Sequence, residues 1–592
     1  MHQNSSSLSN ESLTLEFSSN PVWYAVQALP YLKQGMDNCA EATFNKIYAN
    51  SIAAYLVNKN PIIKTWFEKI KKDTASLLTN LQKNQQLKQV LLEETPWVLA
   101  ANTDAERKKN LSELFDLLKL AESNQSSLEK LQELQLQNGA FSWFKGGYAD
   151  PYITTYILTG IGRLKRLGAI TPDMAIRFKP MIVKAVRFTD DNINTEYQFA
   201  FSHGMNPNKK YINESQIQWL YMRSFYGDIA INSTLASNFY TKQCKLYWNQ
   251  FSVYYKSLIG LIQLRNKEVI FVGKTLLPSL FENAVVDQQK GMYWKQTARD
   301  WYNATIETAS IVIELVSEYN QQNNSTERTK AIDAIKTWLI LNKQTNNWKT
   351  SIKTANACYA ILLNGSDWLQ QEKTVQIALG NTVINSSNEK TELGTGYFEK
   401  RIDGPKVESE MGEIKVTTKT VKSSNQKNNQ PAWGAVYWQY FEDLDKITEA
   451  ASPLNIQKQL MIEKITDKGK ELVSVDLNNP LKVGDKVVVR LVIKTDREME
   501  YLHLKDLRAA GMEPVNVLSG YKWQDGMGYY ENTTDISSNF FISHLNKGTY
   551  VFEYPVYITH TGNFSVGLAS IQCMYAPEFS SHSEGIRINV AE

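Results

Sequence analysis

The fold is decided by a pattern first met in the stretch Gln135-Leu136-Gln137-Asn138-Gly139-Ala140-Phe141-Ser142-Trp143. A polar turn comes directly before aromatic residues, and Thr154-Thr155-Tyr156 follows a few positions later. Asparagine and glycine favour turns, whereas the apolar residues around Thr154 are spaced as on one face of a helix. The stretch therefore predicts a tight turn that leads into a helix.

The pattern recurs further along the chain. The copies are Gln288–Trp294 before Thr305, Lys343–Trp348 before Thr354, and a candidate fourth copy at Trp248. The tryptophans of these later copies lie roughly 50 residues apart, which suits one helical hairpin per repeat. We predict that Trp143, Trp294 and Trp348 take equivalent, buried places in hairpins that stack in a closed ring. The alternative is that they are ordinary core aromatics.

The residues from 21 to 370 are predicted to be helical throughout. Several amphipathic segments repeat apolar residues at spacings of three and four: Glu41–Val57, Leu111–Leu120, Tyr152–Leu167, Ala304–Tyr319 and Thr354–Leu363. Clusters of asparagine, glycine and lysine separate them. This part of the chain is expected to form an α/α toroid, a ring of helical hairpins.

The remaining chain has the composition of β structure. Residues 371–452 read as a β-rich connector, in which Glu413–Val421 alternates and is rich in threonine and valine. Residues 453–592 read as an all-β sandwich, because Lys486–Ile493 and the alternating Tyr550–Ile558 are typical strands. Residues 1–20 are rich in serine and asparagine and are expected to be disordered.

Composition excludes several classes of function. Lysine and arginine total 64 against 61 acidic residues, so the charge gives no reason to expect nucleic acid as a partner. The four cysteines and six histidines show no metal-ligand spacing, so no metal and no cofactor is expected. No signal peptide and no membrane-spanning run is visible, so a membrane would be reached only through an anchor outside this chain.

Three stretches together resemble the alpha-2-macroglobulin family, in particular its bacterial members. Asn38-Cys39-Ala40-Glu41-Ala42-Thr43-Phe44 is similar to the thioester motif of the family, Cys-Gly/Ala-Glu-Gln. Asn138–Tyr156 is similar to a segment of the same domain, and Leu504–Glu513 with Gly562–Phe564 and Met574–Glu578 to the C-terminal macroglobulin sandwich. The order of the motifs implies the C-terminal part of such a protein: a toroid thioester-type domain, a connector and a macroglobulin-type sandwich.

The thioester motif is degenerate at Cys39, Ala40, Glu41 and Ala42. A thioester forms when the cysteine sulfur displaces ammonia from the side-chain amide of a glutamine three residues later, but alanine at position 42 has no side-chain carbonyl. Some family members pass the acyl group through a histidine, and here only His203 lies in the helical region. We therefore expect no catalytic residue, and Cys39 is expected to be a plain buried thiol.

Two other classes of function compete with this interpretation. A toroid enzyme such as a glycosidase or lyase would need acids placed for proton transfer, for which Asp150 and Glu307 are the isolated candidates. Asp150, followed by proline, reads more simply as a helix N-cap. A binding or scaffold module is the second competitor, with Tyr521–Tyr530 and Trp433–Tyr440 as surface candidates, although core positions are favoured.

The resemblance implies a part of an endopeptidase inhibitor that traps proteases non-covalently in the whole protein, and no enzyme. The implied partners are proteases and upstream macroglobulin domains, and the implied location is the periplasm or the outer membrane. In whole proteins of this family a protease cuts a bait segment upstream of the thioester domain, so this chain is expected to begin after the bait.

Overall fold

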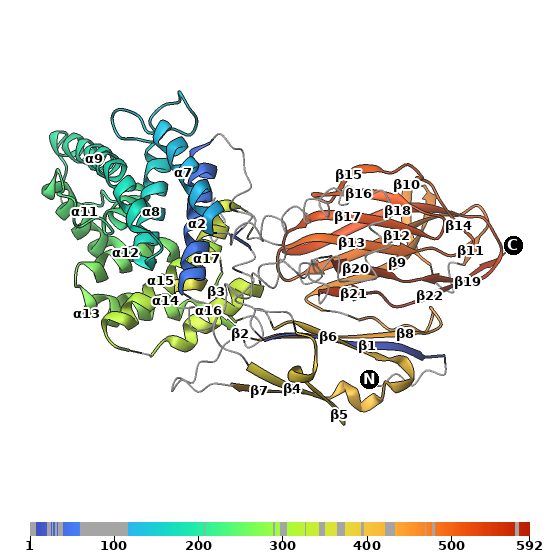
Figure 1. Cartoon of the computed structure of the whole chain (residues 1–592). Helices are drawn as coiled ribbons and strands as arrows, with labels where there is room; N and C mark the ends of the chain where they lie inside the picture. Colours follow the sequence, from blue (N-terminus) through green and yellow to red (C-terminus); the bar gives the residue numbers. More distant parts are fainter. Residues whose placement is uncertain are drawn as a thin grey trace.

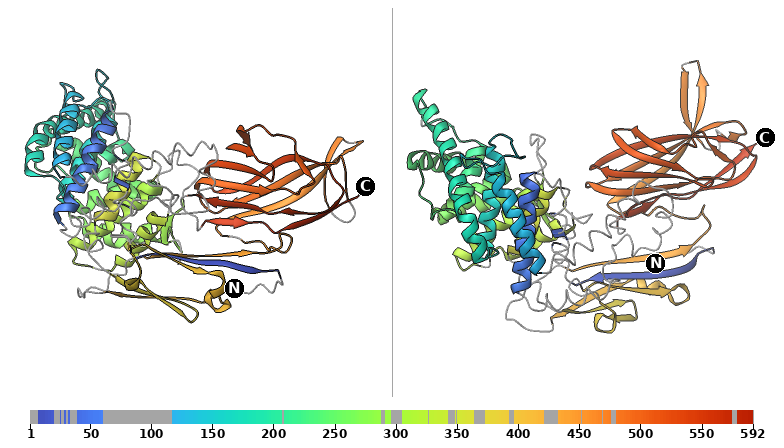
Figure 2. Two further views of the ribbon diagram at one scale, coloured as in Figure 1. Left: turned by 45° about the vertical axis from the view of Figure 1, so that its right-hand side comes forward. Right: turned by 45° about the horizontal axis from the view of Figure 1, so that its top comes forward.

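The structure is a computed structural model in which helices lie on one side and β-sheets on the other (Figures 1 and 2). It describes residues 7–19, 39–59, 117–287, 291–295, 305–341, 350–363, 373–391, 396–420, 432–450, 452–574 and 579–591, less residues 207, 326, 468 and 476–479, together with the single residues Ala25, Ala28, Leu29, Leu32 and Trp348. In this part of the chain no helix is long and apolar enough to cross a membrane.

The first strand corrects the expectation that residues 1–20 are disordered. Strand β1 (Ser9–Ser18) lies between β6 (Phe398–Asp403) and β8 (Trp433–Phe441), antiparallel to both. Its alternate residues Leu13, Leu15 and Phe17 are at most 3% exposed. The alternation of apolar and polar residues is the signal of a half-buried strand. The prediction of disorder was wrong because it considered only the serine and asparagine content of this segment.

The connector and β1 together form one unit, here called the small β unit. Its second sheet has the order β5 (Thr382–Asn385), β4 (Lys373–Leu379) and β7 (Ile414–Thr420). Apolar residues from both sheets share one core cluster, which includes Leu15, Ile377 and Phe398. The helical part of the chain is therefore inserted between the first strand of this unit and the rest of it.

Six helices of the inserted part contact one another in cyclic order, and we call them the inner ring. They are α2 (Ala40–Lys59), α8 (Pro151–Leu167), α10 (Glu214–Arg223), α12 (Val253–Arg265), α15 (Thr305–Gln322) and α17 (Ser351–Leu363). Each contacts the next, and α17 contacts α2, so the series of contacts closes.

The other described helices of this part each pack on the inner helix that precedes them in the chain. They are α7 (Leu117–Glu133) on α2, α9 (Pro172–Ser202) on α8, α11 (Thr234–Tyr247) on α10, α14 (Leu277–Glu282) on α12 and α16 (Thr329–Leu341) on α15. Short pieces, α13 (Val269–Phe271), η2 (Trp248–Gln250) and η3 (Val272–Leu276), complete the turns around α12. The unit is therefore a series of helical hairpins.

The buried aromatic of the repeat is placed differently from the prediction in its first copy. Trp294 and Trp348 are buried, and their indole nitrogens donate to Leu280 O and Leu339 O, both at 2.8 Å, in the preceding outer helices. In the first copy the buried aromatic is Phe141, whereas Trp143 is partly exposed. The prediction was wrong for Trp143 because the register of a turn shifts the buried position by two residues.

Similar hydrogen bonds and glycines recur in these turns. The backbone N–H groups of Phe141 and Trp348 each donate to a threonine hydroxyl in the first turn of the next inner helix, at 2.9 and 3.1 Å. Gly139 and Gly291 both have positive φ, and a Cβ there would lie 2.3 and 2.2 Å from a backbone oxygen of the next outer helix. Only glycine fits such a close approach.

The C-terminal sandwich packs two large sheets around one core. One sheet has the order β10 (Gly469–Ser474), β9 (Leu454–Thr466), β12 (Lys486–Thr495), β18 (Gly548–Ile558) and β14 (Met512–Pro514). The other has the order β15 (Gly520–Gln524), β16 (Met527–Thr533), β17 (Ser537–Leu545), β13 (Met499–Leu507), β20 (Ala569–Cys573) and β21 (Ser580–His582). The rings of Phe540 and Phe552, 4.5 Å apart, join the two sheets.

A smaller sheet of β11 (Leu481–Lys482), β22 (Ile586–Ala591) and β19 (Gly562–Gly567) completes the C-terminal sandwich. The expected alternation of β18 is present, since Phe552, Tyr554, Val556 and Ile558 are all buried. The aromatic hairpin β15–β16 differs from the favoured core placement: Tyr521 and Trp523 are 74% and 78% exposed. They alternate with their neighbours on an edge strand whose one face is open to solvent.

Candidate functional site

The structure brings together the two stretches of the helical unit that resemble the thioester domain. Cys39 immediately precedes α2 and forms an isolated antiparallel bridge with Phe144. The backbone N–H of Ala40 donates to Trp143 O at 2.9 Å. Segments about a hundred residues apart thus meet at the first turn of α2, as expected if both belong to one site.

Position 42 lies directly beside the cysteine sulfur. The backbone N–H of Ala42 points at Cys39 Sγ, 3.4 Å away, and the Ala42 side chain is 9% exposed. The first turn of α2 therefore sets the third residue after the cysteine close to its sulfur, and the methyl group there offers nothing to acylate. Cys39 is partly exposed, which corrects the expectation of a buried thiol, whereas Cys244, Cys358 and Cys573 are buried.

Glu41 is engaged away from the thiol. Its Oε1 accepts hydrogen bonds from the hydroxyl of Ser351 at the start of α17 and from Asn45 Nδ2 at 3.4 Å. Asn45 Oδ1 in turn accepts from the Tyr156 hydroxyl at 2.7 Å. These bonds tie the N-terminal parts of α2, α8 and α17 together, so Glu41 helps to close the ring of contacts.

Asp150 is the N-cap of α8, as its sequence context predicts. Its Oδ1 accepts from the backbone N–H of Ile153 at 2.9 Å, and Pro151 opens the helix. Its second carboxylate oxygen accepts from Trp143 Nε1 at 3.0 Å. With both oxygens engaged, Asp150 is a poor candidate for a general acid. Glu307, the other candidate acid, is 5% exposed in the first turn of α15.

His203 caps the C-terminal end of the outer helix α9, where it is exposed. Its Nδ1 lies 2.8 Å from Phe199 O, and its ring is 4.1 Å from the ring of Phe199. These contacts are local to the last turn of an outer helix. They give His203 no part in the site formed by the first turns of the inner helices.

A buried ion network in the middle of the inner ring was not anticipated from the sequence. Glu314 of α15 is fully buried, and the Tyr221 hydroxyl, which lies 2.7 Å from each of its two oxygens, donates its one hydrogen to this carboxylate. Arg265 Nη2 of α12 lies 2.9 Å from Glu314 Oε1, and Arg163 Nη2 of α8 lies 3.5 Å from Oε2. Four inner helices thus meet at one carboxylate.

A second buried carboxylate extends this network by one helical turn. Glu318, 2% exposed, pairs with Arg265 at 3.0 Å and with Arg166 at 3.1 Å. Arg163 also donates to Asn356 of α17, and its guanidinium lies 5.0 Å from the centre of the Tyr359 ring. Sequence spacing places the glutamates one turn apart on a helix face, but it does not show which arginines face them.

Selective alkylation should distinguish Cys39 from the other thiols. Under native conditions iodoacetamide is expected to label Cys39 alone, because the sulfurs of Cys244, Cys358 and Cys573 are covered by the cores, and burial raises the pKa of the Cys244 thiol far above its usual range. Peptide mapping after a time course measures this, with the unfolded chain as the control that labels all four. Equal native rates at Cys39 and Cys358 would contradict the described burial.

A comparison with known proteins finds a family match for most of the sandwich. Residues 454–578 match the family model described as the bacterial alpha-2-macroglobulin MG10 domain. Among curated proteins, the chain is 22% identical over 380 residues to Circularly permutated Ras protein 2 of Dictyostelium discoideum, a match covering 61% of this chain and 9% of that protein. The chain thus spans less than a tenth of the length of that relative.

Two solved structures are similar at low identity. Native alpha-2-macroglobulin from Escherichia coli, spanning domain MG7 to the C-terminus, is 13% identical with a TM-score of 0.34, and 99% of this chain and 79% of that chain are covered. Trypsin-activated alpha-2-macroglobulin from Escherichia coli is 14% identical with a TM-score of 0.45, covering 98% and 34%. The family match lies in the sandwich: residues 454–578 are similar to a bacterial alpha-2-macroglobulin MG10 domain.

Proposed function

We propose that this chain supplies the C-terminal part of an alpha-2-macroglobulin-like endopeptidase inhibitor that traps proteases without a covalent bond. The observation that carries the proposal is the pairing of an MG10-type domain with a thioester-type motif in which Ala42, not glutamine, lies beside Cys39 Sγ. Cys39 corresponds to the cysteine of a thioester motif, but Ala42 lacks the side-chain carbonyl that a thioester needs. The chain is not an enzyme under this proposal.

The helical unit is proposed to be the α/α toroid of the thioester-type domain. The cyclic order of contacts from α2 through α17 and back supports this assignment. The bridge between Cys39 and Phe144 at the start of α2 supports the same assignment, because it joins the two stretches that resemble the thioester domain. Proteases and upstream macroglobulin domains are the proposed partners, and the periplasm or the outer membrane is the proposed location.

The first test is the intact mass of the purified chain. We expect the mass of the sequence, without the loss of ammonia of about 17 Da that a thioester would bring, because Ala42 has no acyl group. Methylamine should not be incorporated. A matched variant, Ala42→Gln, restores the family's residue and serves as the comparison. A deficit of that size in the natural chain, or methylamine uptake, would exclude non-covalent trapping as the sole mode.

The second test is protease inhibition by this chain alone. We expect several endopeptidases to keep their activity toward a large protein substrate at equimolar chain, because neither a bait segment nor the enclosing domains can be identified in this sequence. A small peptide substrate measured in parallel distinguishes caging from blockage of the active site. Protection of the large substrate alone would mean that trapping needs only the parts present here.

A binding module of the cell envelope is the second candidate function. It is favoured by one observation, a cavity of 1120 Å³ at the N-terminal ends of the inner helices. A toroid enzyme is less well supported, because both carboxylate oxygens of Asp150 accept hydrogen bonds and, of the two candidate acids, only Glu307 lines this cavity. Incubation with envelope extracts, followed by a search for bound or cleaved material, separates the three functions.

A further inference from the structure

The central cavity is lined by residues of all six inner helices. Examples are Phe44 of α2, Tyr156 of α8, Gln218 of α10, Tyr254 of α12, Thr308 of α15 and Asn356 of α17. Its volume of 1120 Å³ is slightly above the usual range of small-molecule sites. The cavity lies above the buried ion network, since Arg163 and Tyr221 belong to both.

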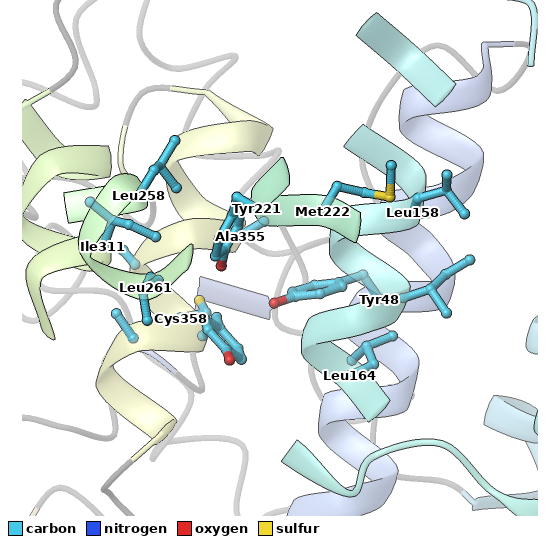
Figure 3. Close-up of a cluster of buried hydrophobic side chains, with 14 of the residues drawn as sticks. Tyr48, Leu158, Leu164, Tyr221, Met222, Leu258, Leu261, Ile311, Ala355 and Cys358 are labelled. Atoms are coloured by element: carbon cyan, nitrogen blue, oxygen red, sulfur yellow. The ribbon is translucent and has the colours of Figure 1, made fainter. Parts of the chain in front are cut away.

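A buried hydroxyl beside the cavity has no partner among the described residues. Tyr48 is 2% exposed, lines the cavity, and has no hydrogen-bond partner for its hydroxyl among the described residues. Figure 3 shows the Tyr48 and Tyr221 side chains within the cluster of buried residues where the inner helices meet. Burial raises the pKa of Tyr48 well above its usual range, so the hydroxyl stays protonated and can donate. An unsatisfied buried donor is costly unless a ligand or water occupies the site.

One inner helix also directs its first turn at the cavity without a side-chain cap. Ser252, at the N-cap of α12, makes no capping hydrogen bond, and the residues from Ser252 to Tyr255 line the cavity. The inner helices α8 and α10 are capped by Asp150 and by an Asn213 capping box. An uncapped first turn exposes backbone N–H donors. A ligand oxygen at this wall could accept from the N–H groups of Val253 and Tyr254.

The cavity also carries acceptors, and its charges nearly balance. The carboxylates of Glu214 and Glu307 line it, and so do Arg163, Lys256 and Lys295. Arg163 is neutralised by Glu314, and Lys256 lies 5.6 Å from the centre of the Trp248 ring. A strongly anionic ligand would meet the two carboxylates, and an apolar ligand would bury the donors without partners. The occupant must therefore offer both donors and acceptors and little net charge.

Aromatic rings supply the rest of the wall. Tyr152, Tyr156, Phe251, Tyr254, Tyr255 and Trp294 come from four parts of the unit and surround the polar groups. Ring faces pack against C–H groups, while tyrosine hydroxyls and the nearby amides bond to polar atoms. We propose that the central cavity binds a neutral oligosaccharide of a few sugar residues, whose hydroxyls both donate and accept and whose ring faces pack on these aromatics. This inference does not depend on protease trapping.

The test is calorimetric titration of the full chain with neutral soluble oligosaccharides of two to six residues from glucan, mannan and N-acetylglucosamine series. Acidic oligosaccharides and short neutral peptides serve as competing ligand classes. Saturable binding of at least one neutral series supports the proposal. Binding of only the acidic sugars or only the peptides, or of none of the probes, overturns it.

Two variants locate the binding. Tyr48→Phe removes one hydroxyl and keeps the ring, so affinity should fall about fivefold while the melting temperature does not fall. Gln218→Leu changes a partly exposed side chain of the cavity wall. It should weaken binding by a similar factor, and this test is independent of the Tyr48 hydroxyl. Tyr521→Ala, on the exposed hairpin of the sandwich, is the matched control and should bind as the natural chain does. Unchanged affinity in both cavity variants would place the sugar elsewhere and refute the site.

Discussion

Glu314→Ala is expected to lower the free energy of unfolding of the helical unit by about 3–5 kcal/mol. The variant leaves the buried Arg163 without its carboxylate and Arg265 with Glu318 alone, and it removes the acceptor of the Tyr221 hydroxyl. The loss of attraction is only part of the cost. The larger part is the uncompensated positive charge that remains away from water.

Thermal unfolding and urea titration of the natural chain and the variant measure this effect, followed by circular dichroism at helical wavelengths. Glu133→Ala is the matched control, because Glu133 pairs with Lys145 at 2.8 Å but is exposed, and an exposed pair contributes about 0–1 kcal/mol. Equal shifts for the two variants would show that the network around Glu314 is hydrated and open. Unfolding of the sandwich should be unaffected in both.

Trp348→Ala is expected to cost about 3–5 kcal/mol as well, through a different mechanism. The indole is 2% exposed, and it ties α17 to the outer helix α16 through the hydrogen bond from Nε1 to Leu339 O. Truncation leaves a cavity too large for the neighbouring helices to fill, and it leaves a buried carbonyl without its donor.

The matched control for this variant is Trp523→Ala, which removes an indole that is 78% exposed and should leave stability nearly unchanged. Hydrogen exchange localises the effect: the amides of α16 and α17 should lose protection first. An unchanged melting temperature for Trp348→Ala would contradict the claim that the buried aromatic of each repeat stabilises its hairpin.

The element types were predictable because local periodicity sets them. The helix predicted over Tyr152–Leu167 is α8 (Pro151–Leu167), and the strand predicted over Lys486–Ile493 is β12 (Lys486–Thr495). Asp150 could be recognised as a cap because its partner, the N–H of Ile153, lies three residues away. Local interactions of this kind depend only on residues that are close in the sequence.

Features that depend on long-range contacts were missed. Glu314 contacts Tyr221 and Arg163, which are separated from it by roughly 90 and 150 residues. No local pattern in any of the three segments predicts these contacts. Tyr48 reads as an ordinary core position of an amphipathic helix until the cavity above it is known. Strand β1 was missed because its sequence neighbours are polar and its partners are distant.

The insertion of the helical unit into the small β unit sets the order in which the chain can fold during synthesis. Residues of β1 bond to partners nearly 400 positions later; Tyr397, for example, donates to Glu16 across 381 residues. At a translation rate of 5 to 20 residues per second, this strand waits on the order of 20 to 80 s for its neighbours. During that interval the helical unit can complete its local contacts, while β1 remains an unpaired edge open to other chains.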